Sequence, residues 1–152
     1  MGGNGTLTIT KILSSNDLGQ TGSHQAGITI PKRPEFLRFF PQLGPTAVNP
    51  SCLVTVKVPQ LKRDTSFRFI YYNGRLTGQS TRNEYRLTTM TGVLRDLSAA
   101  LGDHAVFSRD SHGVITFAVQ KPPKRGGTVD KTHDLLSTVR ILQSGWSIRE
   151  VE

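Results

Sequence analysis

The sequence predicts a mainly β chain with short helices, in the α+β class, folded as one domain. Seven short segments alternate polar and apolar residues, or are rich in β-branched and aromatic residues, as strands are. Clusters of glycine, proline, asparagine and aspartate separate these segments, which is typical of turns between strands. The length of 152 residues is enough for a single domain to bury a core without disulfide or metal support.

The strand pattern is clearest near the N-terminus, where Leu7 and Ile9 alternate with threonines. An Asp-Ser-His-Gly sequence supplies turn chemistry between the last two strands. The predicted strands are residues 6–13, 26–30, 52–58, 66–72, 84–89, 104–109 and 113–120.

Two short helices are predicted within the β-rich part. The first is at 34–40, where Pro34 stands in the opening turn and phenylalanines form the apolar side. The second is at 91–101, where leucines share one face and Gly102 follows the last turn. We expect these aromatic and leucine side chains in the core rather than around a ligand.

The C-terminal part has a different pattern, which begins with a proline- and glycine-rich loop. After it, Thr132 can cap a helix that runs to Gln143, with Gly145 as its C-cap. We expect a main β unit at 1–125 and a C-terminal helix at 126–152 that closes the same structural domain or leads to a linker.

The formal net charge of +8 is unevenly distributed along the chain. Residues 57–95 hold eight basic residues against two acidic ones, a surplus of +6, whereas residues 96–152 balance seven against seven. Arginines outnumber lysines in this charged middle, which favours a polyanionic partner. A solvated basic surface is the alternative, and charge alone does not choose between DNA, RNA and a membrane.

The single cysteine, Cys52, lies in an apolar run, so no disulfide can form within the chain and we expect a buried thiol. A single cysteine without an intrachain disulfide fits a reducing compartment. No apolar stretch is long enough to span a bilayer, and the N-terminus lacks the features of a secretory signal. The sequence therefore predicts a cytoplasmic protein without a membrane partner.

Two polar segments punctuated by glycine stand out, at 14–30 and 71–87. Each starts at the end of an apolar run and carries more hydrogen-bonding side chains than a core can use. Glycine lets the backbone turn tightly while polar groups face outward. We expect two projecting arms, the first arm at 14–30 and the second arm at 71–87, and a matched pair favours a clamp.

The second arm is rich in arginine, asparagine and glutamate, whose donor and acceptor patterns match base edges in the major groove. The first arm adds amide, imidazole and carboxylate groups. The candidate DNA-binding residues are Lys11, Ser14, Asn16, Asp17, Gln20, His24, Gln25, Arg75, Gln79, Ser80, Arg82, Asn83, Glu84 and Arg86.

Several of these residues have competing roles. Glu84 either accepts a hydrogen bond from cytosine N4 or orients the neighbouring arginines through a salt bridge. His24 either contacts DNA or stabilises its loop, and Asp17 can hold the first arm through backbone amides. One of Arg82 and Arg86 can contact a guanine and the other a phosphate, and the sequence does not tell which does which.

The two arms resemble the N-terminal effector domain of EcoRII-type restriction endonucleases. The matching positions in and around the first arm are Lys11, Leu13, Ser14, Asn16, Asp17, Gly19, Thr21, Gly22, His24, Gln25, Gly27, Ile30 and Pro31. Those in the second arm are Tyr71, Tyr72, Asn73, Arg75, Gly78, Thr81, Arg82, Asn83, Glu84 and Arg86. The resemblance covers roughly the first 90 residues closely and the remainder only by general pattern.

This resemblance implies a DNA-binding pseudobarrel, shared with the plant B-three transcription factors, in which seven strands form an open barrel and two arms grip the major groove. It implies double-stranded DNA as the partner, at a short CCWGG-like site, and a nuclease domain elsewhere in the polypeptide that the effector domain regulates. The chain departs from the family pattern at Gln79 and Ser80, where the second arm is longer, at Tyr85, in place of a basic residue, and at Thr29, in place of an aromatic one.

The usual catalytic patterns are missing from the sequence. No acidic residue is followed two places later by lysine, so half of a metal-dependent nuclease motif is absent. The four histidines lack zinc-site spacing, and no phosphate-binding GxxxxGK(S/T) loop occurs. We expect a non-catalytic module without a metal or cofactor. The alternatives are an RNA or single-strand binder that stacks bases on Tyr71, Tyr72 and Tyr85, and a small nuclease built from distant residues.

Overall fold

The computed structural model describes residues 5–20, 27–44, 47–122, 138–141 and 145–151. The chain is mainly β with short helices, as the sequence predicts. All seven predicted strands form, and two more near the C-terminus bring the total among the described residues to nine. These strands are β1 (Thr6–Ile12), β2 (Ile28–Ile30), β3 (Ser51–Val58), β4 (Arg63–Tyr72), β5 (Glu84–Thr88), β6 (His104–Arg109), β7 (Ile115–Gln120), β8 (Thr138–Ile141) and β9 (Trp146–Val151).

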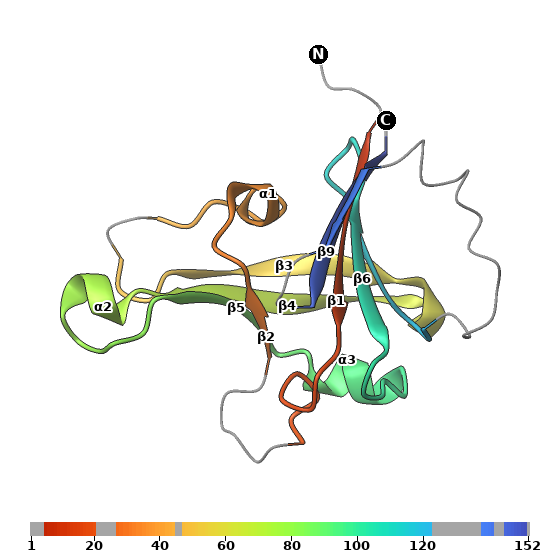
Figure 1. Cartoon of the computed structure of the whole chain (residues 1–152), viewed down its shortest axis with the longest axis horizontal. Helices are drawn as coiled ribbons and strands as arrows, with labels where there is room; N and C mark the ends of the chain where they lie inside the picture. Colours follow the sequence, from red (N-terminus) through yellow and green to blue (C-terminus); the bar gives the residue numbers. More distant parts are fainter. Residues whose placement is uncertain (1–4, 21–26, 45–46, 123–137, 142–144, 152) are drawn as a thin grey trace.

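The nine strands form one sheet in the order β2-β5-β4-β3-β7-β6-β1-β9-β8. Neighbours are antiparallel except β3 and β7, which pair in parallel where Lys57 meets Thr116. The sheet curls, so that β3 and β4 run across the direction of β1, β6 and β9 (Figure 1). The indole Nε1 of Trp146 in β9 donates a 3.0 Å hydrogen bond to the carbonyl oxygen of Thr29 in β2. A side chain thus bridges two strands from opposite parts of the sheet order, which makes the sheet an open barrel.

The core fills the inside of this curl. Strand residues alternate between the core and the outer face, so β3 buries Val54, Val56 and Val58 while the residues between them are exposed. Aromatic rings dominate the centre, where Phe107 contacts Phe117 at a centroid distance of 4.7 Å. Each fully buried phenylalanine contributes about 1.5–3 kcal/mol through the area removed from water.

The helices are short. They are α1 (Pro34–Leu37), α2 (Gly74–Thr77) and α3 (Thr91–Asp96), with a 3₁₀ turn η1 (Pro59–Leu61) between β3 and β4. The helices predicted at 34–40 and 91–101 exist but end early. After α3 the backbone of Ser98 takes a positive φ of 54°, which a continuing helix does not allow. In Figure 1, α1 and α3 lie on opposite sides of β3 and β4.

The prediction of a C-terminal helix is wrong at residues 138–141, the part of it that the structure describes. Residues 138–141 form β8, which pairs antiparallel with β9. Three of these four residues, Thr138, Val139 and Ile141, are β-branched and favour a strand, and β9 offers backbone groups with which such a strand can pair. Gly145 has the positive φ of 81° expected for a helix cap, but it precedes β9 instead. The remaining residues of that predicted helix and the boundary near 125 lie outside the described residues.

Cys52 is half-buried beside the core, and burial raises the pKa of its thiol above the ordinary value. Among the residues that the structure describes, no helix combines the length and apolar character needed to cross a membrane.

Candidate DNA interface

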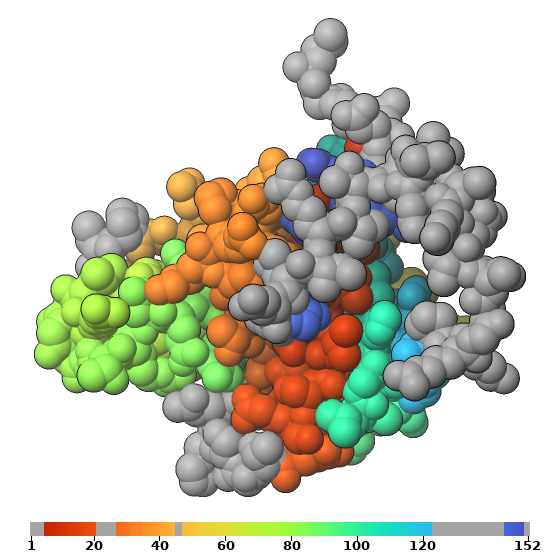
Figure 2. All heavy atoms as spheres, viewed as in Figure 1, coloured from red at the N-terminus to blue at the C-terminus, as the bar shows by residue number. Residues whose placement is uncertain are grey.

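The second arm is the end of the β4–β5 hairpin that projects beyond the sheet, shown in green in Figures 1 and 2. Helix α2 forms its tip, and Gly74 O accepts hydrogen bonds from Gln79 N at 2.9 Å and Ser80 N at 3.2 Å. A Cβ atom on Gly74 would meet the hydroxyl of Ser80 and lie 3.0 Å from its Cβ and 3.2 Å from its backbone nitrogen, so any larger residue here would have to displace Ser80. The arm therefore has a tightly folded tip rather than an extended loop.

The base of the second arm is fixed by Asn73, a residue that the sequence did not single out as structural. Asn73 is 3% exposed, and its side-chain oxygen accepts a 2.9 Å hydrogen bond from Asn49 N. Asn49 Oδ1 in turn accepts from Asn73 N at 3.2 Å, and the Asn73 amide donates to Ala47 O at 2.7 Å. An Asn-Gly pair directly after the aromatic-rich residues 67–72 is the sequence signal that could have marked this turn.

A charged cluster lies where the second arm rejoins the sheet, and we call Tyr72, Arg82, Glu84 and Arg86 the arginine–glutamate cluster. Arg82 Nη2 and Nε donate to one oxygen of Glu84 at 2.7 and 3.1 Å. Arg86 Nε lies 3.4 Å from the same oxygen, and the Arg82 guanidinium sits 3.7 Å from the centre of the Tyr72 ring. The salt bridge that was one of the two roles considered for Glu84 is present, and both arginines converge on this carboxylate.

These contacts set the protonation of Glu84. Burial by itself would raise its pKa, but the hydrogen bond from Arg82 and the charges of Arg86 and Arg82 outweigh burial, so the pKa lies below its ordinary value of 4.5. At neutral pH the side chain is therefore ionised and acts only as an acceptor. It can accept hydrogen bonds from the arginines or from a donor outside the protein.

The tyrosines of the second arm stack within the sheet. Tyr71 and Tyr85 lie face to face with ring centroids 4.2 Å apart, and Tyr85 stacks on Phe69 at 5.6 Å. The Tyr71 hydroxyl donates a 2.5 Å hydrogen bond to Asn83 Oδ1, so the candidate DNA-binding residue Asn83 is attached to this stack. Tyr72 lies under Arg82. The three rings thus contact the protein itself, as expected for strand residues.

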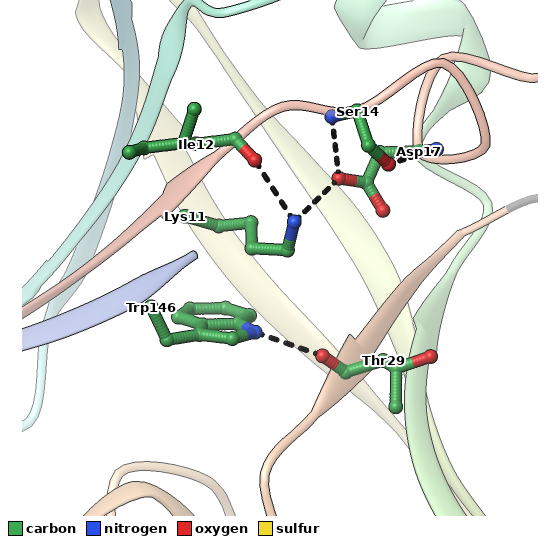
Figure 3. Close-up of polar contacts among 6 residues, drawn as sticks. All are labelled: Lys11, Ile12, Ser14, Asp17, Thr29 and Trp146. Atoms are coloured by element: carbon green, nitrogen blue, oxygen red, sulfur yellow. Dashed lines mark hydrogen bonds and ion pairs between the residues drawn. The ribbon is translucent and has the colours of Figure 1, made fainter. Parts of the chain in front are cut away.

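The first arm begins with a buried ion pair. Lys11 Nζ donates to Asp17 Oδ2 at 2.9 Å and to Ile12 O at 2.8 Å (Figure 3). The same Asp17 oxygen accepts from Ser14 N at 2.9 Å, and Ser14 Oγ accepts from Asp17 N at 3.2 Å. The prediction that Asp17 holds the arm through a backbone amide is confirmed. Lys11 and Asp17 are 9% and 6% exposed, so these two candidate residues belong to the scaffold of the arm.

The other candidates differ in exposure. Arg75, Gln79 and Ser80 are exposed at the tip of the second arm, and Gln20 is exposed in the first. Ser14, Asn16, Arg82, Asn83 and Glu84 are half-buried, whereas Arg86 is buried. His24 and Gln25 lie outside the described residues. The sequence missed Leu76, whose side chain is 71% exposed beside Arg75 at the tip.

The two arms flank the β2–β5 pair. The first arm returns to the sheet at Ile28, opposite Leu87, and the second enters β5 at Glu84, beyond the pair of Ile30 with Tyr85. These entry points lie at opposite ends of the pair, separated by three residues of strand or about 10 Å. Between them, Thr29 and Arg86 face each other in register.

The basic surplus of residues 57–95 is divided in space. Strand β4 has 10 residues, or a length of about 30 Å, and connects η1 at one end with the second arm at the other. Lys62 and Arg63 lie at the η1 end, where Arg63 pairs with Asp96 at 2.6 Å, while Arg75, Arg82 and Arg86 lie in or next to the second arm. Within the described ranges, no group of three potential metal ligands is found.

A hollow of about 550 Å³ lies on the core-facing side of β4 and β5, beside α1. Its lining includes Pro34, Phe40, Phe69 and Tyr85. Because Tyr85 and Glu84 point to opposite faces of β5, this hollow is separate from the arginine–glutamate cluster.

Comparisons with known proteins identify the family and the fold of the chain. The family model described as "Restriction endonuclease EcoRII, N-terminal" matches residues 2–119. The type II restriction enzyme EcoRII of Escherichia coli is 44% identical over 80 residues, which are 51% of this chain and 19% of that enzyme. The chain thus spans about a fifth of the length of this relative.

A solved structure shares the fold. The B3 domain of the UbaLAI restriction endonuclease, crystallised with cognate DNA, matches 97% of this chain and 88% of its own, with a TM-score of 0.61 and 19% sequence identity. The predicted pseudobarrel is confirmed, with nine strands among the described residues in place of seven. From the match over residues 2–119, the chain belongs to the family of the N-terminal domain of restriction endonuclease EcoRII.

Proposed function

We propose that this chain is a sequence-specific, double-stranded DNA-binding effector domain of a type II restriction endonuclease. It reads a short CCWGG-like site in the major groove with its two arms and regulates a nuclease domain outside this chain. The observation that carries the proposal is the arginine–glutamate cluster, which holds two arginines and an ionised acid at the root of a projecting arm.

The chemistry of the cluster matches a G·C base pair. In the major groove, guanine offers two acceptors, N7 and O6, and the paired cytosine offers the N4 donor beside them. A guanidinium next to a carboxylate presents the complementary donors and acceptor. Arg82 and Glu84 are already joined at 2.7 Å, so less side-chain freedom is lost on binding. A surface that bound only phosphates would gain nothing from Glu84, because its charge repels the DNA backbone.

The spacing of the arms suits the groove of B-form DNA. The points where the arms join the β2–β5 pair are about 10 Å apart along the strands. The major groove is about 12 Å wide, so two arms on this spacing can enter one groove. We assign Glu84 to a base edge, Arg82 and Arg86 to base edges or phosphates, and the exposed Arg75, Gln79, Ser80 and Gln20 to further contacts. We assign Lys11 and Asp17 to holding the first arm.

The length of the EcoRII enzyme supports a partner domain. This chain corresponds to 19% of that enzyme, so a nuclease domain in the same polypeptide is compatible with the match. A cytoplasmic location follows from such a role.

The test is a binding titration of this chain against four nucleic acids at one stated salt concentration, because phosphate contacts make affinity depend on salt. The ligands are a duplex with a CCWGG-like site, a duplex of scrambled sequence, the separate strands and the matching RNA. We expect the site-bearing duplex to bind at least about 10³-fold more tightly than the scrambled one. Tighter binding of the single strands or RNA would favour the alternative binder instead, and nicking of plasmid with Mg²⁺ would favour a nuclease.

A further inference from the structure

Two consecutive residues of the C-terminal segment hold both ends of the first arm. Gly145 O accepts a 2.9 Å hydrogen bond from Ile12 N at the end of β1. Trp146 Nε1 donates a 3.0 Å hydrogen bond to Thr29 O in β2 (Figure 3). Because the first arm leaves the sheet after Ile12 and returns at Ile28, its two stems are tied to one point on the C-terminal strand. We call Ile12, Thr29, Gly145 and Trp146 the stem joint.

Trp146 is itself rigidly placed. Its side chain is 1% exposed, its ring contacts Phe36 edge to face at 5.5 Å, and it lies 6.5 Å from the ring of Phe107. In register it pairs with Lys11, whose ammonium group anchors Asp17 in the first arm. A buried indole N–H requires an acceptor, and here that acceptor is a carbonyl on a strand across the barrel opening. The hydrogen bond therefore fixes β2 relative to β9.

The stem joint also reaches the arginine–glutamate cluster. Thr29, whose carbonyl accepts the indole N–H, is the register partner of Arg86 in β5. The Nε atom of Arg86 in turn lies 3.4 Å from Oε1 of Glu84. A shift of β2 away from Trp146 would move the strand that flanks Arg86 and would change the distance between the two arms.

We propose that Trp146 is a positioning residue for DNA recognition, which fixes the first arm relative to the second. It holds the returning end of the first arm through Thr29, while the adjacent Gly145 holds the outgoing end through Ile12. This inference rests on the proposed function. It gives a role in sequence selectivity to a strand outside the family match at residues 2–119. Since coupling between sites is reciprocal, a duplex that requires this arm geometry also stabilises the docking of β9.

Trp146→Phe in the whole chain tests the role of the hydrogen bond. Phenylalanine keeps an aromatic ring against Phe36 and Phe107 but has no N–H for Thr29 O. We expect affinity for the site-bearing duplex to fall about tenfold, as for one lost hydrogen bond that leaves its partner unsatisfied, and affinity for the scrambled duplex to change less than about twofold. The control is Val58→Ala, a core change at the end of β3 next to η1, for which both affinities should stay near those of the original chain. Equal losses on both duplexes, or the same selectivity loss in the control, would overturn the proposal.

A second measurement needs no variant, because Trp146 is the single tryptophan of the chain. Its indole N–H gives one resonance in a ¹⁵N–¹H spectrum. The site-bearing duplex should shift this resonance and slow its exchange with solvent, while the scrambled duplex should do neither. If saturating site-bearing duplex changes neither the chemical shift nor the solvent exchange of the indole N–H, the positioning role is refuted, even if Trp146→Phe fails to fold.

The two proposals can fail separately. If the original chain binds both duplexes with equal affinity, the proposed function is wrong and so is this inference. If it prefers the site-bearing duplex, these two experiments test the inference alone.

Discussion

The two arms use similar residue types in opposite ways. At the base of the first arm, Lys11 of β1 and Asp17 form a 2.9 Å ion pair whose side chains are 11% and 6% exposed. In the second arm, Arg82 and Glu84 form a 2.7 Å ion pair whose side chains are 32% and 28% exposed. The first pair is part of the scaffold and fixes the shape of its arm. The second pair faces solvent, where its groups are available to another molecule.

This difference in burial predicts a difference in what each pair controls. A buried charge depends on its partner, because no water replaces it when the partner is removed. A half-exposed pair is screened and exchanges partners at little cost. Changes in the first pair should therefore act on folding, and changes in the second on nucleic-acid binding.

The largest effect is expected for Lys11→Met, which leaves the buried Asp17 carboxylate without its cation. The free energy of unfolding should fall by about 3–5 kcal/mol, measured by urea denaturation. The double variant with Asp17→Asn should recover part of this loss, because it removes the uncompensated charge. A change below about 1 kcal/mol in Lys11→Met would show that the carboxylate escapes to solvent, and the contrast between the arms would fail.

Arg38 provides the matched control for this measurement. Arg38 and Glu150 form an ion pair with the same 2.9 Å separation, but their side chains are 55% and 60% exposed. Arg38→Met should therefore cost less than about 1 kcal/mol. Comparable losses in the two variants would show that burial is not the deciding property.

The next effect in size is expected for Arg82→Ala in the second arm. Binding of the site-bearing duplex should weaken by about 1–3 kcal/mol, while binding of the scrambled duplex and the stability of the fold change much less. A fluorescence titration with both duplexes measures the difference. Equal losses on both would make Arg82 a phosphate anchor instead of a base contact.

The smallest effect concerns pH. The pKa of Glu84 is lowered in the folded chain, so its contribution to stability is present above the ordinary value of 4.5 and is lost as the pH falls through the folded value. Arg82→Ala removes a hydrogen bond and a charge, and the pKa of Glu84 should move back up. A ¹³C titration of the Glu84 carboxyl group in both chains measures this shift. An unchanged pKa would mean that Arg82 does not hold the carboxylate in solution.

The sequence predicted the strands well because their signal is local. Alternation such as that of Val54, Val56 and Val58 follows directly from one face being buried. The C-terminal strands carry a weaker signal, because β8 has only four residues, in a stretch whose spacing of leucines and valines also fits a helix. Strand β9 alternates only Trp146 and Ile148 with polar residues, and it pairs with β1 from the far end of the chain. Pairing over this sequence distance cannot be found by periodicity.

The candidate site divides in the same way. The concentration of arginine and asparagine in the second arm, together with Glu84, was visible in the sequence, and the structure brings Arg82, Glu84 and Arg86 together. The burial of Lys11 was not visible, because it depends on Asp17 and on the β9 strand that pairs with β1. Trp146 was missed for the same reason, since its partner Thr29 lies 117 positions away in the sequence. Local chemistry identified the residues, and long-range packing assigned their roles.

The most direct test of two arms that together read base pairs is selection of bound duplexes from a randomised pool, followed by competition at a stated salt concentration. The proposed function predicts that a short, near-palindromic motif with G·C pairs on both sides is enriched. It also predicts that enrichment at those G·C pairs is lost with Arg82→Ala. A bound pool that stays random, while the chain still binds DNA, would contradict base reading and leave only a basic surface.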